Sequence, residues 1–293
     1  MSTIAVTGPT GQLGRLAVEA LLDRGVAPSS IVAVVRSPAK AADLADRGVQ
    51  VREADYGQPE ALVAALRGVD RLLLVSSSDP GQRFDHHANV IKAAAEAGVG
   101  FVAYTSILSA GDTKMLLAAD HIATEDALRA SGLRYALLRN GWYTENYTAQ
   151  LATILEHGAL LGSAQDGRVA PAARRDYAEA AAVVLTTDGH DGQAYELAGD
   201  EAITLTELAA IIAEVTGEEV AYRDLPAAEY EQVLAGAGVP APMPAILADS
   251  DVGILRGELV TDSGDLARLI GHPTTPVADT VREAAAALSS AAA

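Results

Sequence analysis

The sequence predicts an α/β fold, in which a doubly wound parallel sheet is followed by a small C-terminal lobe. Three observations support this prediction. Apolar runs typical of strands alternate with amphipathic helical patterns through the first half of the chain. The first of these runs leads into three glycines that open a helical pattern. Other runs, such as Leu72–Val75, are apolar at every position, which is typical of strands buried on both faces of a parallel sheet.

The length and composition narrow the functions open to this protein. Its 293 residues suffice for one large α/β domain, or for one such domain with a smaller lobe. The formal net charge of −18 argues against binding to nucleic acids or anionic membrane surfaces, because both are negatively charged. The absence of cysteine excludes disulfides, thiolate catalysis and cysteine-ligated metals. The chain opens on a strand pattern and has no long apolar run, so we expect a cytoplasmic protein.

Strand and helix patterns alternate in the order that a parallel sheet with right-handed crossovers requires. Six strands are expected, at Ile4–Thr7, Ile31–Val35, Val49–Glu53, Arg71–Val75, Phe101–Thr105 and Arg134–Leu138. Five helices are expected between them, at Gln12–Arg24, Ala39–Arg47, Pro59–Leu66, Arg83–Ala97 and Ala119–Ala130. Ligands bind beyond the carboxyl ends of the strands in such sheets, so the residues that follow each strand are the first candidates for a site.

The turn after the first strand has the composition of a phosphate-binding loop. Gly8 permits a tight turn, Gly11 lets backbone N–H groups approach a diphosphate, and Gly14 lets the helix pack closely on the strand. The helix N-terminus offers unpaired N–H groups and a favourable dipole to an anion. We therefore expect a Rossmann-type dinucleotide-binding domain, with an ordinary βα turn as the alternative. The expected cofactor-binding loop comprises Gly8, Pro9, Thr10, Gly11, Gln12, Leu13 and Gly14.

Two basic residues follow the second strand. An NAD-specific site usually has Asp or Glu at this point, about 20 residues past the glycines, to hold the ribose 2′-hydroxyl. This chain has Arg36 there, and Lys40 lies one helical turn further on. An arginine fork fits a 2′-phosphate and its plane can stack on adenine. The pair therefore favours NADP(H) over NAD(H); the alternative is a solvated basic pair at a helix start.

Polar residues also follow the third and fourth strands. Asp55 has two alternative roles: it accepts a hydrogen bond from the adenine amino group, or it caps the helix near Gln58. Ser76, Ser77 and Ser78 follow the fourth strand, and we expect their hydroxyls and backbone to lie along the nicotinamide ribose. The alternative is an ordinary polar loop.

The sixth strand leads into an aromatic segment that contains the only tryptophan of the chain. Aromatic rings interleaved with asparagines offer a flat apolar wall with amide donors, which suits a planar ring that carries carbonyl oxygens. Trp142 packing the second lobe onto the first is a compatible alternative. The candidate residues of the segment are Asn140, Gly141, Trp142, Tyr143 and Asn146.

The pattern loosens after about residue 150. We therefore predict an NADP-binding domain over residues 1–150 and a smaller, partly interleaved substrate-side lobe over residues 151–293, with a helix at 176–186 returning to the first domain. Helices are expected at 148–155 and 205–215, the second capped by Thr204 with Glu207 at capping-box spacing. We expect a strand at 195–199, a loop at 240–244 and an alanine-rich C-terminal tail that frays.

The catalytic pair of most short-chain dehydrogenases, a tyrosine with a lysine four residues later on a helix, is missing. The residues four positions before Lys40, Lys92 and Lys114 are not tyrosines. Tyr135 has Arg139 at this spacing, but both lie on the predicted sixth strand or at its end. This absence argues against oxidation of alcohols or sugar hydroxyls and against epimerase chemistry.

The histidines provide little evidence for a metal site or for acid–base catalysis. Asp85-His86-His87 has no third partner at ligand spacing, so no metal site is expected. His121 lies at the start of the helix after the fifth strand and is a candidate proton donor, although a solvated or capping histidine is the simpler interpretation.

The residues resemble the NmrA-like branch of the atypical short-chain dehydrogenases, and within it the type 2 NADPH:quinone oxidoreductases. The likeness spans nearly the whole chain, and the segment from Leu138 to Asn146 is its most specific part. The other matching segments are 7–14, 34–40, 54–57, 74–78, 247–253 and 269–275. Pro9 replaces the usual alanine and removes one N–H group from the loop.

The resemblance implies that residues 8–13, Arg36, 76–78 and 141–146 contact NADPH, and that a quinone lies over the nicotinamide near Trp142 and Asn146. We therefore expect an NADPH:quinone oxidoreductase that passes a hydride directly to the quinone without flavin, with Trp142, Asn146 and His121 as its catalytic candidates. The alternative is an NmrA-type redox sensor that binds NADP(H) without turnover. A homodimer is compatible with the sequence, which leaves the oligomeric state open.

Overall fold

The computed structural model describes residues 2–77 and 81–291, which form two compact units. Unit 1 comprises Met1–Ala110, Ala119–Asn140 and Arg174–Tyr195, and unit 2 comprises Gly111–Ala118, Gly141–Ala173 and Glu196–Ala293. The assignment of the cofactor to residues 1–150 and of the substrate side to residues 151–293 stays a prediction. Ser78 lies outside the described residues.

Unit 1 is built on a seven-stranded sheet with the strand order β3-β2-β1-β4-β5-β6-β9. The first six strands pair in parallel, which confirms the predicted doubly wound α/β fold. Their bounds are β1 Ile4–Thr7, β2 Ile31–Val35, β3 Gln50–Glu53, β4 Arg71–Leu74, β5 Phe101–Ile107 and β6 Tyr135–Asn140, and β9 is Ala194–Leu197. Strands β5 and β6 run two residues further than predicted, because Ser106 pairs with Arg139 and Ile107 with Asn140.

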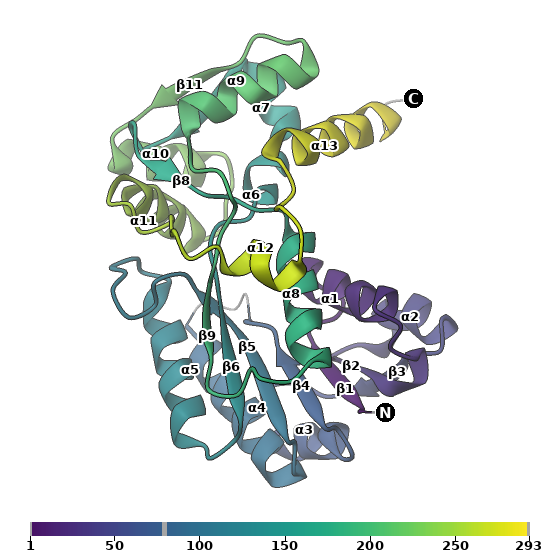
Figure 1. The fold of residues 1–293 in the computed structure, drawn as a ribbon. Coiled ribbons are helices and arrows are strands. Elements are labelled where there is room, and N and C mark those ends of the chain that lie inside the picture. Colours follow the sequence, from purple (N-terminus) through teal and green to yellow (C-terminus); the bar gives the residue numbers. More distant parts are fainter. Residues whose placement is uncertain (1, 78–80, 292–293) are drawn as a thin grey trace. The chain divides into compact units, whose positions relative to one another are not determined.

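Helices cover both faces of this sheet (Figure 1). On one face, α3 (Pro59–Leu66), α4 (Arg83–Ala97) and α5 (Ala118–Ala130) pack on the apolar side chains of the strands. On the other face, α1 (Gln12–Asp23) packs against α8 (Arg174–Thr186), the helix through which the chain returns to unit 1. The helix predicted over 39–47 is instead a 3-10 turn, η2 (Pro38–Ala41), followed by the short α2 (Ala42–Asp46).

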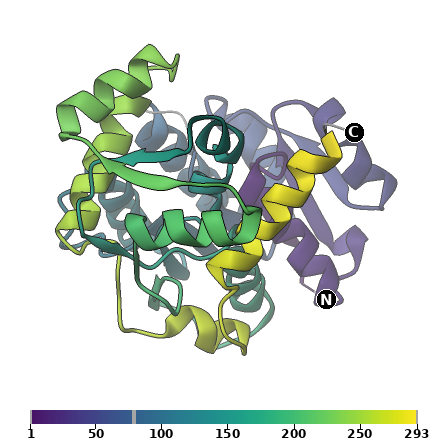
Figure 2. The same cartoon turned by 90° about the horizontal axis from the view of Figure 1, so that it is seen from above.

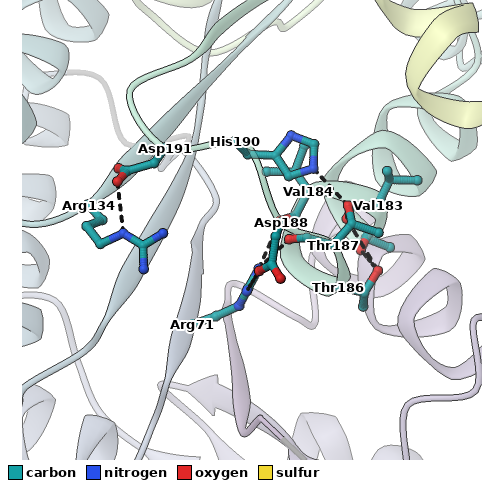
Figure 3. A network of polar contacts seen from close by, with 10 residues as sticks. Arg71, Arg134, Val183, Val184, Thr186, Thr187, Asp188, His190 and Asp191 are labelled. Atoms are coloured by element: carbon teal, nitrogen blue, oxygen red, sulfur yellow. Dashed lines mark hydrogen bonds and ion pairs between the residues drawn. The ribbon is translucent and has the colours of Figure 1, made fainter.

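Arginines hold the amino ends of the central strands, opposite the end where a ligand is expected. Arg71 at the start of β4 donates to the Thr187 carbonyl oxygen at 2.7 Å and pairs with Asp188 at 2.7 Å. Arg134 pairs with Asp191 at 2.9 Å (Figure 3). These contacts tie the loop after α8 to the sheet, so we treat this polar cluster as structural.

Unit 2 contains short strand pairs and helices. Strand β7 (Ala159–Gly162) pairs in parallel with β11 (Ala221–Asp224), and the two lie side by side in Figure 2. Strand β8 (Arg168–Val169) pairs antiparallel with β10 (Ile203–Thr204). The helices are α6 Glu145–Thr148, α7 Leu151–His157, α9 Leu205–Thr216, α10 Ala227–Gly236, α11 Met243–Leu255, α12 Asp265–Ile270 and α13 Val277–Ala291.

Two predictions for unit 2 are confirmed, the helix expected at 205–215, which is α9, and its capping box, and two are wrong. The capping box at the start of α9 is present: Thr204 accepts from the Glu207 N–H, and the Glu207 side chain accepts from the Thr204 N–H. The helix predicted over 148–155 is two helices, α6 and α7. The loop predicted over 240–244 ends at Pro242, because Pro244 lies in the first turn of α11, where its missing N–H costs nothing. The alanine-rich C-terminal stretch up to Ala291 belongs to α13, which packs on α9, and the fraying of its end stays a prediction.

None of the helices in the described part of the chain is long and apolar enough to cross a lipid bilayer.

Candidate functional site

The glycine loop of unit 1 has a conformation that requires its glycines. Gly8 has a φ of +59°, in the left-handed region, and its carbonyl oxygen accepts from the Gly11 N–H at 3.0 Å. A Cβ on Gly14 would lie 2.2 Å from the Gly8 carbonyl oxygen. Gly11 caps α1 without a side-chain hydrogen bond, and the first turn of α1 has no acidic residue. The N-terminus of α1 is therefore built as an anion-binding end, and the residues present fit a dinucleotide diphosphate.

Arg36 and Lys40 project from the carboxyl end of β2 and from the 3-10 turn after it. Both side chains are exposed, and no acidic side chain of the described residues forms an ion pair with either. The neighbouring Tyr56 is partly buried, and this burial raises the pKa of its hydroxyl to about 12, against the hydrogen bond from Thr7 and the charge of Arg36. Two cations without acidic partners stand in a protein with a net charge of −18, so they are available to an anionic ligand.

The Asp55 side chain shapes the turn after β3. Its Oδ1 accepts from the Gly57 N–H at 2.7 Å, as in an Asx turn. The N-cap of α3 is Gln58, and no side chain caps that helix. The helix-cap alternative for Asp55 is therefore wrong, and contact with the adenine stays a prediction.

Three side chains hold the backbone N–H groups of the segment after β4. The Val75 N–H donates to Thr7 Oγ1 at 3.0 Å and the Ser76 N–H to Thr105 Oγ1 at 2.8 Å. The Ser77 N–H donates to His87 Nε2 at 2.9 Å. Arg83 holds the Ser77 carbonyl oxygen from the other side at 2.6 Å. The segment expected to line the nicotinamide ribose is thus positioned by four side chains up to Ser77.

His87 is a positioning residue that sequence reasoning missed. It is fully buried on α4, and because Nε2 accepts from the backbone, the proton lies on Nδ1, which contacts Thr124 Oγ1 at 2.9 Å. Thr124 in turn donates to the Asp120 carbonyl oxygen at 2.7 Å. Burial, with the charge of Arg83, lowers the pKa of His87 to about 3, so the ring is neutral. Its place on the apolar stripe with Val90, Ile91 and Ala94 was the available signal.

His121 is buried in the first turn of α5, so its interpretation as a solvated histidine is wrong. Its Nδ1 lies 2.8 Å from the Tyr104 hydroxyl. Burial lowers the pKa of His121 well below its usual range, and the charge of Arg83 lowers it further. The ring is therefore neutral at pH 7, so His121 can relay a proton but is not a net proton donor at this pH.

Glu125 joins β5, β6 and α5. This carboxylate is 1% exposed and accepts four hydrogen bonds: from Ser106 at 2.6 Å, from Arg139 at 2.9 and 2.7 Å, and from Arg129 at 2.7 Å. Burial raises the pKa of Glu125, but the bonds from Arg139, Ser106 and Arg129 outweigh it and the net shift is downward. Arg139 is thus committed to Glu125 and lies with Tyr135 on strand β6, which confirms that this pair is not the helical catalytic pair.

The aromatic segment of unit 2 is pinned to the strand-like stretch around Ala172. The Ala172 N–H donates to the Trp142 carbonyl oxygen at 3.1 Å, and the Thr144 N–H donates to the Ala172 carbonyl oxygen at 3.0 Å. Trp142 is 9% exposed, whereas Tyr143 and Asn146 are half-buried. The segment follows Asn140, the buried last residue of β6, so chain connectivity carries it directly on from the sheet.

The predicted cofactor residues therefore fall into two groups. Unit 1 carries the glycine loop, Arg36, Lys40, Asp55, Ser76, Ser77 and Asn140, and unit 2 carries Gly141, Trp142, Tyr143 and Asn146. Within the described ranges, no three His, Asp or Glu side chains are grouped in a way that could hold a metal ion.

Comparison with known proteins identifies the family. A sequence model described as NAD(P)H-binding matches residues 8–211. Quinone oxidoreductase 2 of Escherichia coli is 52% identical over 95% of this chain and 97% of its own. The NmrA-like family domain-containing oxidoreductase flvB of Aspergillus flavus is 31% identical over 95% of this chain and 93% of its own.

Two solved structures share the fold. The NADPH complex of the E. coli NADPH-dependent quinone oxidoreductase QOR2 superposes with a TM-score of 0.93, covering 96% of this chain and 99% of that one. The NADP(H) complex of a Citrobacter triphenylmethane reductase, 41% identical, gives a TM-score of 0.91 over 96% of this chain and 99% of that one. The glycine loop and the match across nearly the full length of both chains lead to one conclusion: this chain belongs to the NAD(P)H-binding family that includes quinone oxidoreductase 2 and its NmrA-like relatives.

Proposed function

We propose that this protein is an NADPH-dependent quinone reductase that transfers a hydride directly to the quinone without a flavin. The observation that carries the proposal is the likeness to quinone oxidoreductase 2, which extends over 95% of this chain and so includes both units. The glycine loop and the two cations without acidic partners supply a matching dinucleotide site. No tyrosine–lysine pair is needed, because a quinone ring is already electron-poor.

The sequence motifs and the likeness to NADPH-binding relatives support the following cofactor-binding roles. The loop Gly8–Gly14 holds the diphosphate, Arg36 and Lys40 hold the 2′-phosphate, and Asp55 accepts from the adenine amino group. Ser76, Ser77 and the neighbouring Ser78 lie along the nicotinamide ribose. Asn140, Gly141, Tyr143 and Asn146 contact the nicotinamide side of the cofactor.

The chemistry needs a hydride and a proton. NADPH, when bound, supplies the hydride, and with one proton the quinone becomes the hydroquinone and NADP+ is left. Trp142 offers the quinone a flat apolar wall, and Asn146, or Asn140, donates a hydrogen bond to the carbonyl oxygen on which charge develops. The net proton comes from water; His121 is the second candidate, and because its ring is neutral it can only relay a proton taken up from water, through its contact with the Tyr104 hydroxyl.

Arg36→Ala tests the coenzyme preference. Losing a charge-assisted contact to the 2′-phosphate is expected to raise the KM for NADPH by roughly 10- to 30-fold, which corresponds to about 1.5–2 kcal/mol. The KM for NADH should change less than twofold, since NADH has no 2′-phosphate. Steady-state kinetics with both coenzymes measure this, and an equal rise for both would remove Arg36 from the 2′-phosphate site.

Trp142→Ala tests whether the indole ring of Trp142 contacts the bound quinone. We expect the KM for a simple quinone to rise about tenfold, in line with the loss of one aromatic contact, while the Kd for NADPH changes little. Because Trp142 is buried, the melting temperature must be measured alongside, and the kinetics compared well below it. Wild-type kinetics in this variant would exclude Trp142 from the site.

The first experiment on the proposed function is NADPH oxidation by the purified protein, followed by absorbance, with a panel of simple quinones and NADH as the control. NADPH-selective turnover without added flavin is the expected result. The second candidate function is an NADP(H)-binding redox sensor, which the missing tyrosine–lysine pair also fits. Tight NADPH binding without turnover of any quinone would favour the sensor. A cytoplasmic location and a homodimer remain expectations under either function.

A further inference from the structure

We propose that Tyr147 of unit 2 donates a hydrogen bond to a carbonyl oxygen of the bound acceptor, and that Asp251 adjusts the strength of this donor. The proposal rests on the proposed quinone reductase function and gives a role to two residues to which the sequence analysis assigned none. Tyr147 lies on α6, directly after the aromatic segment, and Asp251 lies on α11.

The Tyr147 hydroxyl has an unmet hydrogen-bonding capacity. The side chain is 8% exposed, and within the described part of the chain its hydroxyl makes no hydrogen bond of normal geometry. The Trp142 indole N–H lowers the pKa of Tyr147 slightly as a donor, but an indole N–H offers no acceptor for the phenol proton. A buried phenol whose proton lacks an acceptor destabilises the folded state, so an acceptor is expected to complete it in the working protein.

A second orphaned hydroxyl lies in the same segment. Thr144, the N-cap residue of α6, is fully buried, and its Oγ1 has no hydrogen-bond partner among the described residues. Thr144 and Tyr147 are three residues apart and lie on one side of this helical turn. Two donors without acceptors on one short segment match a ligand rich in acceptors, and a quinone carries carbonyl oxygens and no protons to donate.

Asp251 is an unusual carboxylate for a protein interior. It is 6% exposed, its Oδ2 accepts from the Ser163 N–H at 2.7 Å, and no cation of the described residues pairs with it. Strand β7 packs closely against the Asp251 carboxylate, since a Cβ on Gly162 would lie 2.8 Å from Asp251 Oδ2. Burial, with the charge of Asp224, raises the pKa of Asp251 to about 6. A buried and unpaired acid destabilises the fold at neutral pH, which points to a function.

The charge of Asp251 acts on the ionisation of the Tyr147 hydroxyl. Burial raises the pKa of Tyr147 well above its usual range, and the negative charge of Asp251 raises it further. The other titratable groups around Asp251 are Asp224 and Tyr222 from β11 and Tyr230 from α10. Both tyrosines have raised pKa values, mainly through burial, so they stay protonated and leave Asp251 as the group that titrates near neutrality.

The consequence for the reaction is direct. Tyr147 keeps its proton and stabilises the oxygen that gains charge as the hydride arrives, and the net proton still comes from water, directly or through His121. When Asp251 takes up a proton at lower pH, its charge disappears and the Tyr147 phenol becomes a stronger donor. Quinone reduction is therefore expected to increase as the pH falls through about 6.

Tyr147→Phe is the primary test, with Tyr135→Phe on β6 as the matched control. At saturating NADPH we expect kcat/KM for 1,4-benzoquinone to fall at least tenfold in Tyr147→Phe, while the control stays within twofold of wild type. The Kd for NADPH, measured by energy transfer from Trp142, should not change, and the melting temperature should stay level or rise because an orphaned hydroxyl is removed. Unchanged kcat/KM would overturn the proposal and assign the hydroxyl to structure or to a buried water.

Asp251→Asn tests the second residue through its pH profile. Asn keeps an oxygen for the Ser163 N–H but cannot titrate, so kcat/KM for benzoquinone should lose its dependence on pH between 5 and 8. A profile identical to that of wild type would remove Asp251 from the proposal.

The subsite can be tested even if the proposed reductase function fails. If the wild-type protein turns over no quinone, saturable quenching of the single tryptophan by benzoquinone still reports binding. Weaker quenching in Tyr147→Phe than in wild type would then support the subsite, and equal or absent quenching would overturn it.

Discussion

Gly14→Ala is expected to raise the Kd for NADPH by roughly 100-fold, which corresponds to about 3 kcal/mol, within the cost that overpacking imposes on a closely packed site. The new methyl group would lie 2.2 Å from the Gly8 carbonyl oxygen and 3.1 Å from Pro9 Cα. Both neighbours are backbone atoms, so no side chain can rotate away. Either α1 or the loop must shift, and the loop N–H groups are then no longer oriented to donate hydrogen bonds to the diphosphate.

Two other glycines provide graded controls for this prediction. A Cβ on Gly11 would lie 3.3 Å from the same carbonyl oxygen, so Gly11→Ala should weaken NADPH binding much less. A Cβ on Gly236, within helix α10, meets no atom within 4 Å, and Gly236→Ala should leave NADPH binding unchanged and stabilise the helix slightly. Isothermal titration with NADPH measures all three. Similar affinities for Gly14→Ala and Gly11→Ala would show that close packing at Gly14 does not shape the site.

Glu125→Ala is expected to lower the free energy of unfolding by about 3–5 kcal/mol, because breaking a buried ion pair leaves uncompensated charge. Arg139, mostly buried, and Arg129 would both lose their shared carboxylate, and Ser106 would lose its acceptor. The melting temperature should fall by roughly 10 °C. Asp126→Ala is the matched control: Asp126 pairs with Arg129 at the exposed surface, so its loss should cost less than about 1 kcal/mol. Equal effects of the two changes would contradict this role of Glu125.

The pH dependence of this effect has a definite sign. The folded protein holds the pKa of Glu125 below the value of an unfolded chain. Its contribution to stability is therefore fully present above about pH 4.5 and is lost as the pH falls through the lower folded pKa. Wild type should lose stability below pH 4.5 more steeply than Glu125→Gln does, and thermal melts across pH 3–7 compare the two directly. Parallel curves would show that Glu125 is not the group responsible.

Much of the fold followed from local patterns. The bounds of β1, β2, α3 and α4 coincide with the predicted ranges, because their apolar runs and caps lie in the sequence itself. The predicted bounds were wrong where pairing with a distant segment of the chain sets the end of an element. Strands β5 and β6 extend beyond their predicted ends because they pair with each other.

The site divides in the same way. The glycine loop, Arg36 and the aromatic segment were predicted from the sequence, because their residue types and spacing carry the chemistry. His87 was dismissed, since its role depends on the Ser77 N–H and on Thr124, which is 37 residues away. Tyr147 and Asp251 lie in or beside segments that the sequence analysis noted, but neither was given a role, because an orphaned hydroxyl or an unpaired carboxylate is defined only by what surrounds it.

The sequence by itself thus determined the class of sheet and the dinucleotide loop, and it predicted NADP(H) from Arg36. These properties reside in short stretches whose backbone geometry is set by neighbouring residues. Only the tertiary structure decided which polar groups are buried, which protons they hold and which of them lack a partner. Burial and hydrogen bonding between distant segments set those properties, as the shifted pKa values of His87 and Asp251 show.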